Sequence, residues 1–353
     1  MVQLKSFDNG NVQPKPRYGH LSATNPGFAP MRDVVDKDIA QLWELPHDEF
    51  LQAWADRPPA LLDDSPVIGK DITTELLQIP VRDGTLIEIC VYKPISPELN
   101  AILNFNTHGG GWYLKTQVLQ MVLTCAGFVV GTHSSEEAQN RMIAYTNKTV
   151  VVSPAYRMAP KYKFPYAIND SFDALLWCKK NASKLGVNPE RIVLSGGSAG
   201  ANIAAVLAQT ALREHVSGII GQVLNIPVTC HPTFFPHDEF ELNSYRQNAS
   251  GSIVDQPMMM WFWDQYLPQP EPDWRASPLL VEDLRGLPPA LVQIAGADPL
   301  RDEGFAYADR LVRAGVRTTV KVYPGLPHGF YFFMQLKEAR EYLEEVSKFI
   351  KSL

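Results

Sequence analysis

The chain has 353 residues, a net charge of −6 and a hydrophobic fraction of 45%. This length fits one large α/β domain with inserted segments, because such domains routinely exceed roughly 200 residues. The acidic balance and the lack of a long basic run argue against nucleic acid as the main partner. The four cysteines lie far apart and form no CxxC pair, which argues against a disulfide framework and against a zinc or other metal site.

The start of the chain carries no apolar stretch of the kind found in secretory signal peptides. The longest nearly apolar run, VLQMVLTCAGFVVG (118–131), is shorter than the roughly 18 residues that a membrane-spanning helix needs. The sequence therefore predicts a cytoplasmic protein without stable membrane insertion.

Residues 1–75 are rich in Pro, Asp and Trp and contain helical fragments such as DVVDKDIAQLWEL (33–45). From residue 76 to the end, short strand-like runs alternate with helical patterns, which predicts a mostly parallel central sheet flanked by helices. Several of the runs are apolar throughout, as expected for strands covered on both faces. The predicted strands are 86–92, 101–106, 149–153, 191–195, 221–226, 290–295 and 318–323.

Residues 227–278 interrupt this alternation and hold the run MMMWFWDQYL (258–267). A stripe of Met and aromatic residues is more often core than ligand-binding surface. Here, however, it lies in an insertion beside the predicted site, so we expect a substrate-facing cap. The N-terminal segment 1–75 is expected to complete that cap, and residues 76–353 to form the catalytic domain that carries the insertion.

The stretch GGSAG (196–200) places Ser198 between the predicted strand RIVLS and an alanine-rich helix. The G-x-S-x-G pattern in strand–turn–helix context is typical of a nucleophile elbow, in which a tight turn exposes the serine. The turn requires small residues on either side of the serine, and the start of the helix directs partial positive charge toward its oxygen. The alternative is a glycine-rich turn that contains a serine by chance.

A serine hydroxyl needs a base and an orienting acid before it can act as a nucleophile. In this arrangement the acid and the histidine follow the serine in that order, each after a later strand. Asp298 follows the strand 290–295, and His328 follows the strand 318–323 on a Pro/Gly-rich loop. Asp302 is a rival acid, but it lies a turn further into the next element, so Asp298 is favoured.

The motif NTHGGGW (106–112) follows the predicted strand 101–106. Glycines allow backbone N–H groups to converge on a small anion without side-chain clash. We expect the N–H groups of Gly109, Gly110 and Ala199 to form an oxyanion hole, and His108 to fix the loop rather than to transfer protons.

Taken together, these motifs make the chain resemble the hormone-sensitive-lipase-like branch of the α/β-hydrolases from about residue 76 to residue 335. The resemblance implies the α/β-hydrolase fold, hydrolysis of carboxylic esters through an acyl-serine, no cofactor and a helical cap. It implies a small-molecule ester as substrate, while the aromatic and Met residues of the insertion and the expected cap favour a short to medium acyl group or an aromatic one. The motifs are HGGGW (108–112), YRMAPKYKFPYAINDSFDALLW (156–177), GGSAGANIA (196–204), SPL (277–279), GADPLRDEG (296–304) and PHGF (327–330).

Three departures from the family pattern stand out. Gly197 precedes the serine where many relatives carry Asp, and Ala155 and Lys161 stand where Asp and Glu are usual. Residues 112–127 also split a pattern that would otherwise read HGGGFVVGTHSSEEA. This segment is either a flap over the acyl pocket, a translated unspliced intron that damages the oxyanion loop, or an additional surface loop.

The same triad also serves acyltransferases, lactonases and cyclases of biosynthetic pathways, so these stay as an alternative to hydrolysis. A ligand-binding receptor ranks lower. The plant gibberellin receptors share the scaffold but have lost the catalytic histidine, whereas His328 is present here. A homodimer is a candidate assembly.

Overall fold

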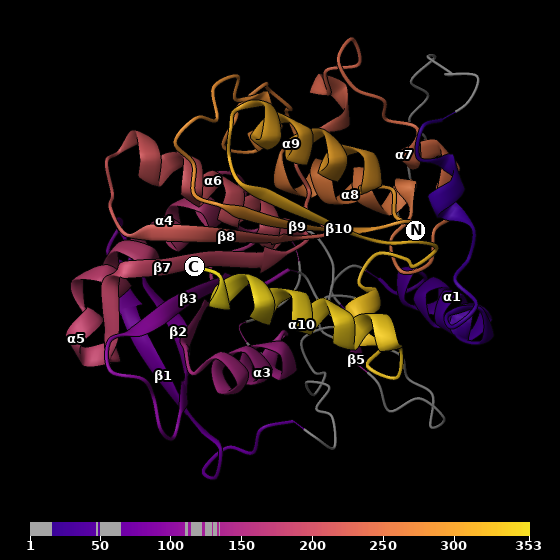
Figure 1. Cartoon of the computed structure of the whole chain (residues 1–353). Helices are drawn as coiled ribbons and strands as arrows, with labels where there is room; N and C mark the ends of the chain where they lie inside the picture. Colours follow the sequence, from indigo (N-terminus) through magenta and orange to yellow (C-terminus); the bar gives the residue numbers. More distant parts are fainter. Residues whose placement is uncertain are drawn as a thin grey trace.

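We describe a computed structural model that covers residues 16–46, 49, 65–109, 112–113, 122–123, 129, 133 and 135–353. At its centre lies an eight-stranded sheet with the order β1-β2-β6-β3-β7-β8-β9-β10 (Figure 1). Its strands are β1 (Ile72–Pro80), β2 (Leu86–Pro94), β3 (Ala101–Thr107), β6 (Val150–Pro154), β7 (Val187–Gly197), β8 (Ile219–Asn225), β9 (Ala290–Ala295) and β10 (Thr318–Tyr323). A separate pair, β4 (Trp112–Tyr113) and β5 (Val122–Leu123), is antiparallel.

The sheet is parallel from β6 to β10, and only β1 and β2 run antiparallel to their neighbours. This confirms the predicted mostly parallel sheet. The apolar runs are buried on both faces, and β3 and β9 are buried along their whole length. The sequence prediction missed β1, which begins at Ile72, so the predicted boundary at residue 76 falls inside a strand.

Helices cover both faces of the sheet, as the alternating pattern predicts. Figure 1 shows α3 (Glu137–Asn147) and α10 (Lys337–Lys351) on one face, and α4 (Tyr166–Lys180), α6 (Ala199–Arg213) and α9 (Arg301–Arg313) on the other. On α10 the apolar side chains of Leu343, Val346 and Ile350 are buried. The short helices α5 (Ala182–Leu185) and α7 (Ser244–Gln247) complete the connections.

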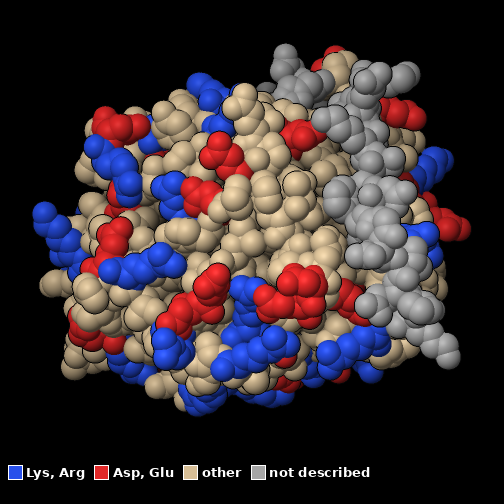
Figure 2. Space-filling model, turned by 90° about the horizontal axis from the view of Figure 1, so that it is seen from above, with Lys and Arg blue, Asp and Glu red and all other residues tan. Residues whose placement is uncertain are grey.

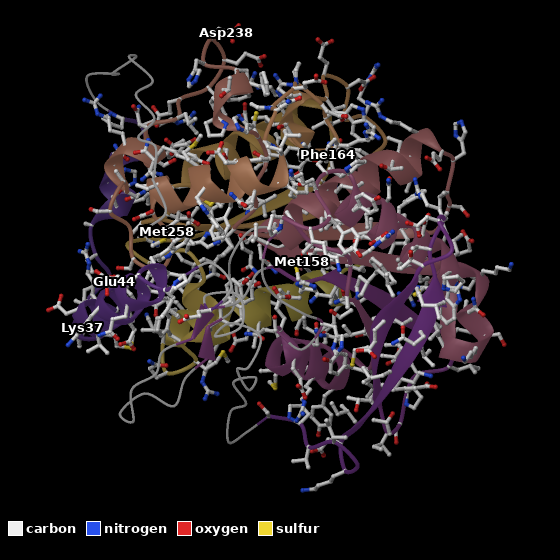
Figure 3. The ribbon with its side chains drawn as sticks, turned by 180° about the vertical axis from the view of Figure 1, so that it is seen from behind. Lys37, Glu44, Met158, Phe164, Asp238 and Met258 are labelled. Carbon is white, nitrogen blue, oxygen red and sulfur yellow. The ribbon has the colours of Figure 1, made fainter. Side chains whose placement is uncertain are left out.

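Two helices from distant parts of the sequence pack against each other through aromatic rings. Trp43 at the end of α1 (Ala29–Trp43) lies edge-on to Trp261 and Phe262 of α8 (Gln256–Tyr266), with ring centroids 5.1 and 5.9 Å apart. Figure 3 marks Met258 near the first end of α8 and Phe164 near its other end, where the Phe164 ring contacts Tyr266 at 5.7 Å. The aromatic stripe of the insertion is therefore largely packed into the core.

The segment before α1 lies directly on the loop that follows β10. The N–H of Gly325 donates to the carbonyl of Leu21 at 2.7 Å, and the N–H of Asn25 donates to the carbonyl of Gly325 at 2.9 Å. The approach is so close that a Cβ at Gly325 would lie 2.0 Å from the Ala23 oxygen. Arg301 reinforces the contact from α9 through a 2.8 Å hydrogen bond to the Ser22 hydroxyl.

The described part of the surface seen in Figure 2 carries acidic and basic side chains that are interspersed rather than gathered into one large area of a single sign. Among the helices that the structure describes, none combines the length and the apolarity needed to cross a bilayer.

Candidate active site

Ser198 sits between the end of β7 and the start of α6 with φ 56° and ψ −117°. This positive φ is strained for a non-glycine residue, as expected for a nucleophile elbow. The neighbouring glycines are required by close backbone contacts. A Cβ at Gly196 would lie 2.4 Å from the backbone of Gly200, and a Cβ at Gly200 would lie 1.9 Å from the carbonyl oxygen of Thr107.

The structure brings the predicted serine, histidine and acid together in one hydrogen-bonded chain. His328 Nε2 lies 2.9 Å from Ser198 Oγ, and His328 Nδ1 lies 2.7 Å from Asp298 Oδ2. All three side chains are buried. An imidazole that gives its Nδ1–H to a carboxylate presents an unprotonated Nε2 to the serine, which is the tautomer that a general base needs.

Two further hydrogen bonds hold the acid in place. The other carboxylate oxygen of Asp298, Oδ1, accepts the N–H of Leu300 at 2.8 Å. The Asn248 side chain, from the segment after α7, donates to the Asp298 carbonyl at 2.9 Å. The insertion 227–278 therefore contacts the loop that carries the acid directly.

Asp302, the rival acid, is occupied elsewhere. Its Oδ1 accepts from Arg301 Nε at 2.8 Å, and its Oδ2 accepts from the N–H of Ser244 at 2.7 Å. Both side chains of the Arg301–Asp302 pair are fully buried. The structure thus places Asp302 in an ion pair within α9 and in a hydrogen bond to α7, and places Asp298 against the histidine.

His108 and Gly109 follow β3 and lie beside the elbow. The Tyr156 hydroxyl donates to the His108 carbonyl at 2.6 Å, and the Tyr156 and His108 rings stack at 4.4 Å with 9° between their planes. His108 Nδ1 donates to the Gly109 carbonyl. Burial lowers the pKa of His108 to about 4, so the ring is neutral at pH 7 and serves as a fixed part of the loop.

The structure describes two of the three predicted oxyanion donors, Gly109 and Ala199, and their N–H groups lie in different surroundings. Ala199 is the first residue of α6, where a backbone N–H has no partner within the helix. The N–H of Gly109, by contrast, donates to Glu136 Oε1 at 3.1 Å. Gly110 lies outside the described residues, as does most of the 112–127 segment, of which the structure describes only the backbone of β4 and β5.

Glu136 is a buried acid next to the site that the sequence reasoning did not identify. Burial raises the pKa of its carboxyl group, while hydrogen bonds from Asn106 and from the Gly109 N–H act in the opposite direction. The only signal for it in the sequence is its place at the start of a helix after the HGGG motif, and that signal does not reveal its contact with Gly109.

The segment that lacks the two usual charges is braced by other residues. Arg157 Nη2 pairs with the fully buried carboxylate of Asp170 at 2.7 Å, and its Nη1 pairs with Asp83 at 2.7 Å. The guanidinium also lies over the Tyr166 ring at 4.6 Å. Lys161 is exposed, and its amine lies over the Tyr162 ring.

No cluster of three or more metal-ligating side chains occurs within the described ranges.

The chain is similar over most of its length to known proteins of one family. A family model described as the alpha/beta hydrolase fold matches residues 121–332. The carboxylesterase NlhH of Mycobacterium tuberculosis is 33% identical over 282 residues, which are 78% of this chain and 79% of that protein. A hyperthermophilic esterase from Pyrobaculum calidifontis has a similar structure, with a TM-score of 0.74, 33% identity, and coverage of 94% of this chain and 98% of that one.

Vibralactone cyclase has a TM-score of 0.74 at 25% identity and covers 99% of this chain and 97% of its own. These matches point to the same fold as the parallel sheet with its flanking helices and the serine elbow. The chain belongs to the α/β-hydrolase family.

Proposed function

We propose that this protein is a serine-dependent carboxylic ester hydrolase in which Ser198 is the nucleophile, His328 the general acid and base, and Asp298 the orienting acid. The observation that carries the proposal is the continuous hydrogen-bonded chain from Ser198 Oγ through the imidazole to Asp298. The family supports it, since the relatives named above include a carboxylesterase and an esterase.

In this proposal Ser198 Oγ attacks the ester carbonyl while His328 Nε2 takes its proton. The negative charge that develops on the carbonyl oxygen is stabilised by the N–H of Ala199 at the positive end of α6. The imidazolium then gives its proton to the leaving alcohol, and an acyl-serine remains. A water molecule, deprotonated by His328, then attacks the acyl group. His328 returns the proton to Ser198, and the carboxylic acid product leaves.

We expect small esters with short to medium acyl or aromatic groups as substrates. The 227–278 segment and the N-terminal segment would act as the cap that limits acyl length, supported by the contact of Trp43 with α8. A homodimer and a cytoplasmic location stay predictions, which light scattering and cell fractionation can test.

The decisive test is hydrolysis of p-nitrophenyl acetate, butyrate, octanoate and palmitate by wild type and by Ser198→Ala. Loss of a catalytic serine leaves only the contributions of binding and the oxyanion hole, so the turnover should fall by roughly 10³-fold or more. Ser183→Ala, at an exposed serine of α5, is the matched control and should retain full activity. Near wild-type activity of Ser198→Ala would refute the proposal.

Ring closure is the second candidate, favoured by the nearly complete coverage of this chain by vibralactone cyclase. The acyl-serine would form in the same way, but a hydroxyl of the substrate's own acyl chain would displace Ser198 and give a lactone. Mass spectrometry of the products separates the two reactions. Incorporation of ¹⁸O from labelled water identifies hydrolysis, and an unlabelled lactone identifies cyclisation.

A further inference from the structure

Glu136 carries a buried carboxylate that the proposed reaction does not use. The residue precedes α3 and is 4% exposed. Its Oε1 accepts the N–H of Gly109 at 3.1 Å, and its Oε2 accepts the side-chain amide of Asn106 at 2.8 Å. A buried carboxylate is costly unless hydrogen bonds compensate it. Here both donors come from the end of β3 and the loop that follows.

Asn106 connects this carboxylate to the strand that carries the nucleophile. The Asn106 amide oxygen accepts from Ser195 Oγ at 2.9 Å, and its amide nitrogen also donates to Asn140 at 2.8 Å. Ser195 lies on β7, just before the elbow, and all of these side chains are buried. Glu136 is therefore held in a network that spans β3, β7 and α3, so its position relative to Ser198 is fixed.

The same carboxylate also occupies the space above Gly197. A Cβ at that position would lie 3.0 Å from Glu136 Oε1 and 2.3 Å from the Tyr331 hydroxyl. Residue 197 is the position at which the family resemblance leads one to expect Asp. In this chain, side chains from two distant segments fill that space instead, and one of them supplies a carboxylate.

We propose that Glu136 is a positioning residue for the oxyanion loop. Its carboxylate anchors the loop through the Gly109 N–H and replaces an acid at position 197. The proposal rests on the proposed function. It revises the sequence-based role of Gly109, because an N–H held by Glu136 fixes the loop instead of binding the substrate oxygen.

The test compares Glu136→Gln and Glu136→Ala with wild type on p-nitrophenyl butyrate. The Gln side chain has one acceptor oxygen and places an NH₂ group against one of the two donors. Misplacement of a catalytic loop by about 1 Å costs up to roughly 10²-fold in rate. We expect kcat to fall about tenfold in Glu136→Gln and about a hundredfold in Glu136→Ala. KM should change much less than kcat.

A second readout separates positioning from general destabilisation. A trifluoromethyl ketone adds to the serine and forms an oxyanion, so its inhibition constant should rise by the same factor as kcat falls. Rates are expressed per active site, titrated with a fluorophosphonate. Glu137→Gln is the matched control, because this adjacent acid pairs with Arg141 on α3, and it should leave both quantities unchanged.

Rescue from position 197 gives the most specific result. Gly197→Asp alone should lose activity because Tyr331 and Glu136 fill the space. Added to the double variant Glu136→Ala/Tyr331→Phe, however, Gly197→Asp should restore a carboxylate near the loop. The triple variant should therefore have a higher kcat than the double variant.

Wild-type kcat and ketone affinity in both Glu136 variants would overturn the proposal, as would a fall in kcat with unchanged ketone affinity. Glu136→Gln keeps the side-chain volume, so it decides the matter even if Glu136→Ala fails to fold. Wild-type protein without esterase activity, or an active Ser198→Ala, would instead break the proposed function.

Discussion

Two glycine-containing loops meet at Ser198, and they are held in place in different ways. The elbow is fixed by close backbone contacts within itself and with Thr107 at the end of β3, which leave no room for a Cβ at Gly196 or Gly200. The described part of the oxyanion loop, His108 and Gly109, is held by Tyr156 and Glu136, which come from other segments. The GGSAG motif therefore contains the glycines that the elbow needs. The HGGG motif shows where the oxyanion loop lies but not which residues hold it.

The largest effect is expected at the elbow. In Gly200→Ala the new methyl group would lie 1.9 Å from the Thr107 oxygen, and neither backbone can move without separating β3 from α6. We expect no folded, active protein, as measured by soluble yield and circular dichroism. Gly304→Ala is the control, because its Cβ would meet Ile294 at an ordinary 3.4 Å in the first turn of α9. A folded and active Gly200→Ala would remove the contrast between the two loops.

The next largest effect distinguishes Asp298 from Asp302, the acids just before and just after the start of α9. Asp298→Asn should lower kcat by about 10⁴-fold with little loss of stability, because an amide no longer holds His328 in the required tautomer. Asp302→Asn should leave kcat within a few-fold but destabilise the fold by roughly 3–5 kcal/mol, since Arg301 stays buried without its charge partner. Kinetics and urea unfolding measure the two quantities, and the reverse result would exchange the roles of the acids.

The smallest effect concerns the pH dependence of stability through His108. Its pKa is about 4 in the folded protein and roughly 6.5 when unfolded. The unfolded chain therefore binds a proton over this window that the folded protein does not. Stability should fall by roughly 1.4 kcal/mol per pH unit as the pH is lowered from about 6.5 to about 4.

His108→Phe keeps a ring to stack on Tyr156 and should remove this contribution. Urea midpoints at pH 7 and pH 5 provide the comparison. The contribution of His231, whose pKa burial also lowers to about 4, remains in the variant. An identical pH dependence in wild type and His108→Phe would contradict a neutral, buried His108.

Most of the fold could be predicted because the parallel strands are buried on both faces and read as continuous apolar runs. β1 was missed for the opposite reason. It is an edge strand whose side chains are largely exposed, and the polar residues in ITTELLQIP hide its strand character. Ser198, Asp298 and His328 could be placed because each follows a recognisable strand. Glu136 could not, since its role depends on a contact across 27 residues of sequence that include the split motif.

The contact between residues 21–25 and the loop after β10 has a consequence for engineering. That segment leads into α1, a helix of the expected cap, and its backbone is bonded to Gly325, close to His328 in the sequence. In the proposed function, the cap that limits the substrate would thus be bonded to the loop that carries the general base. A cap grafted from a relative would disturb this loop unless the donor also matched the backbone contact at Gly325, where a Cβ would lie 2.0 Å from the Ala23 oxygen. Recombination boundaries should accordingly lie after Asn25, not before it.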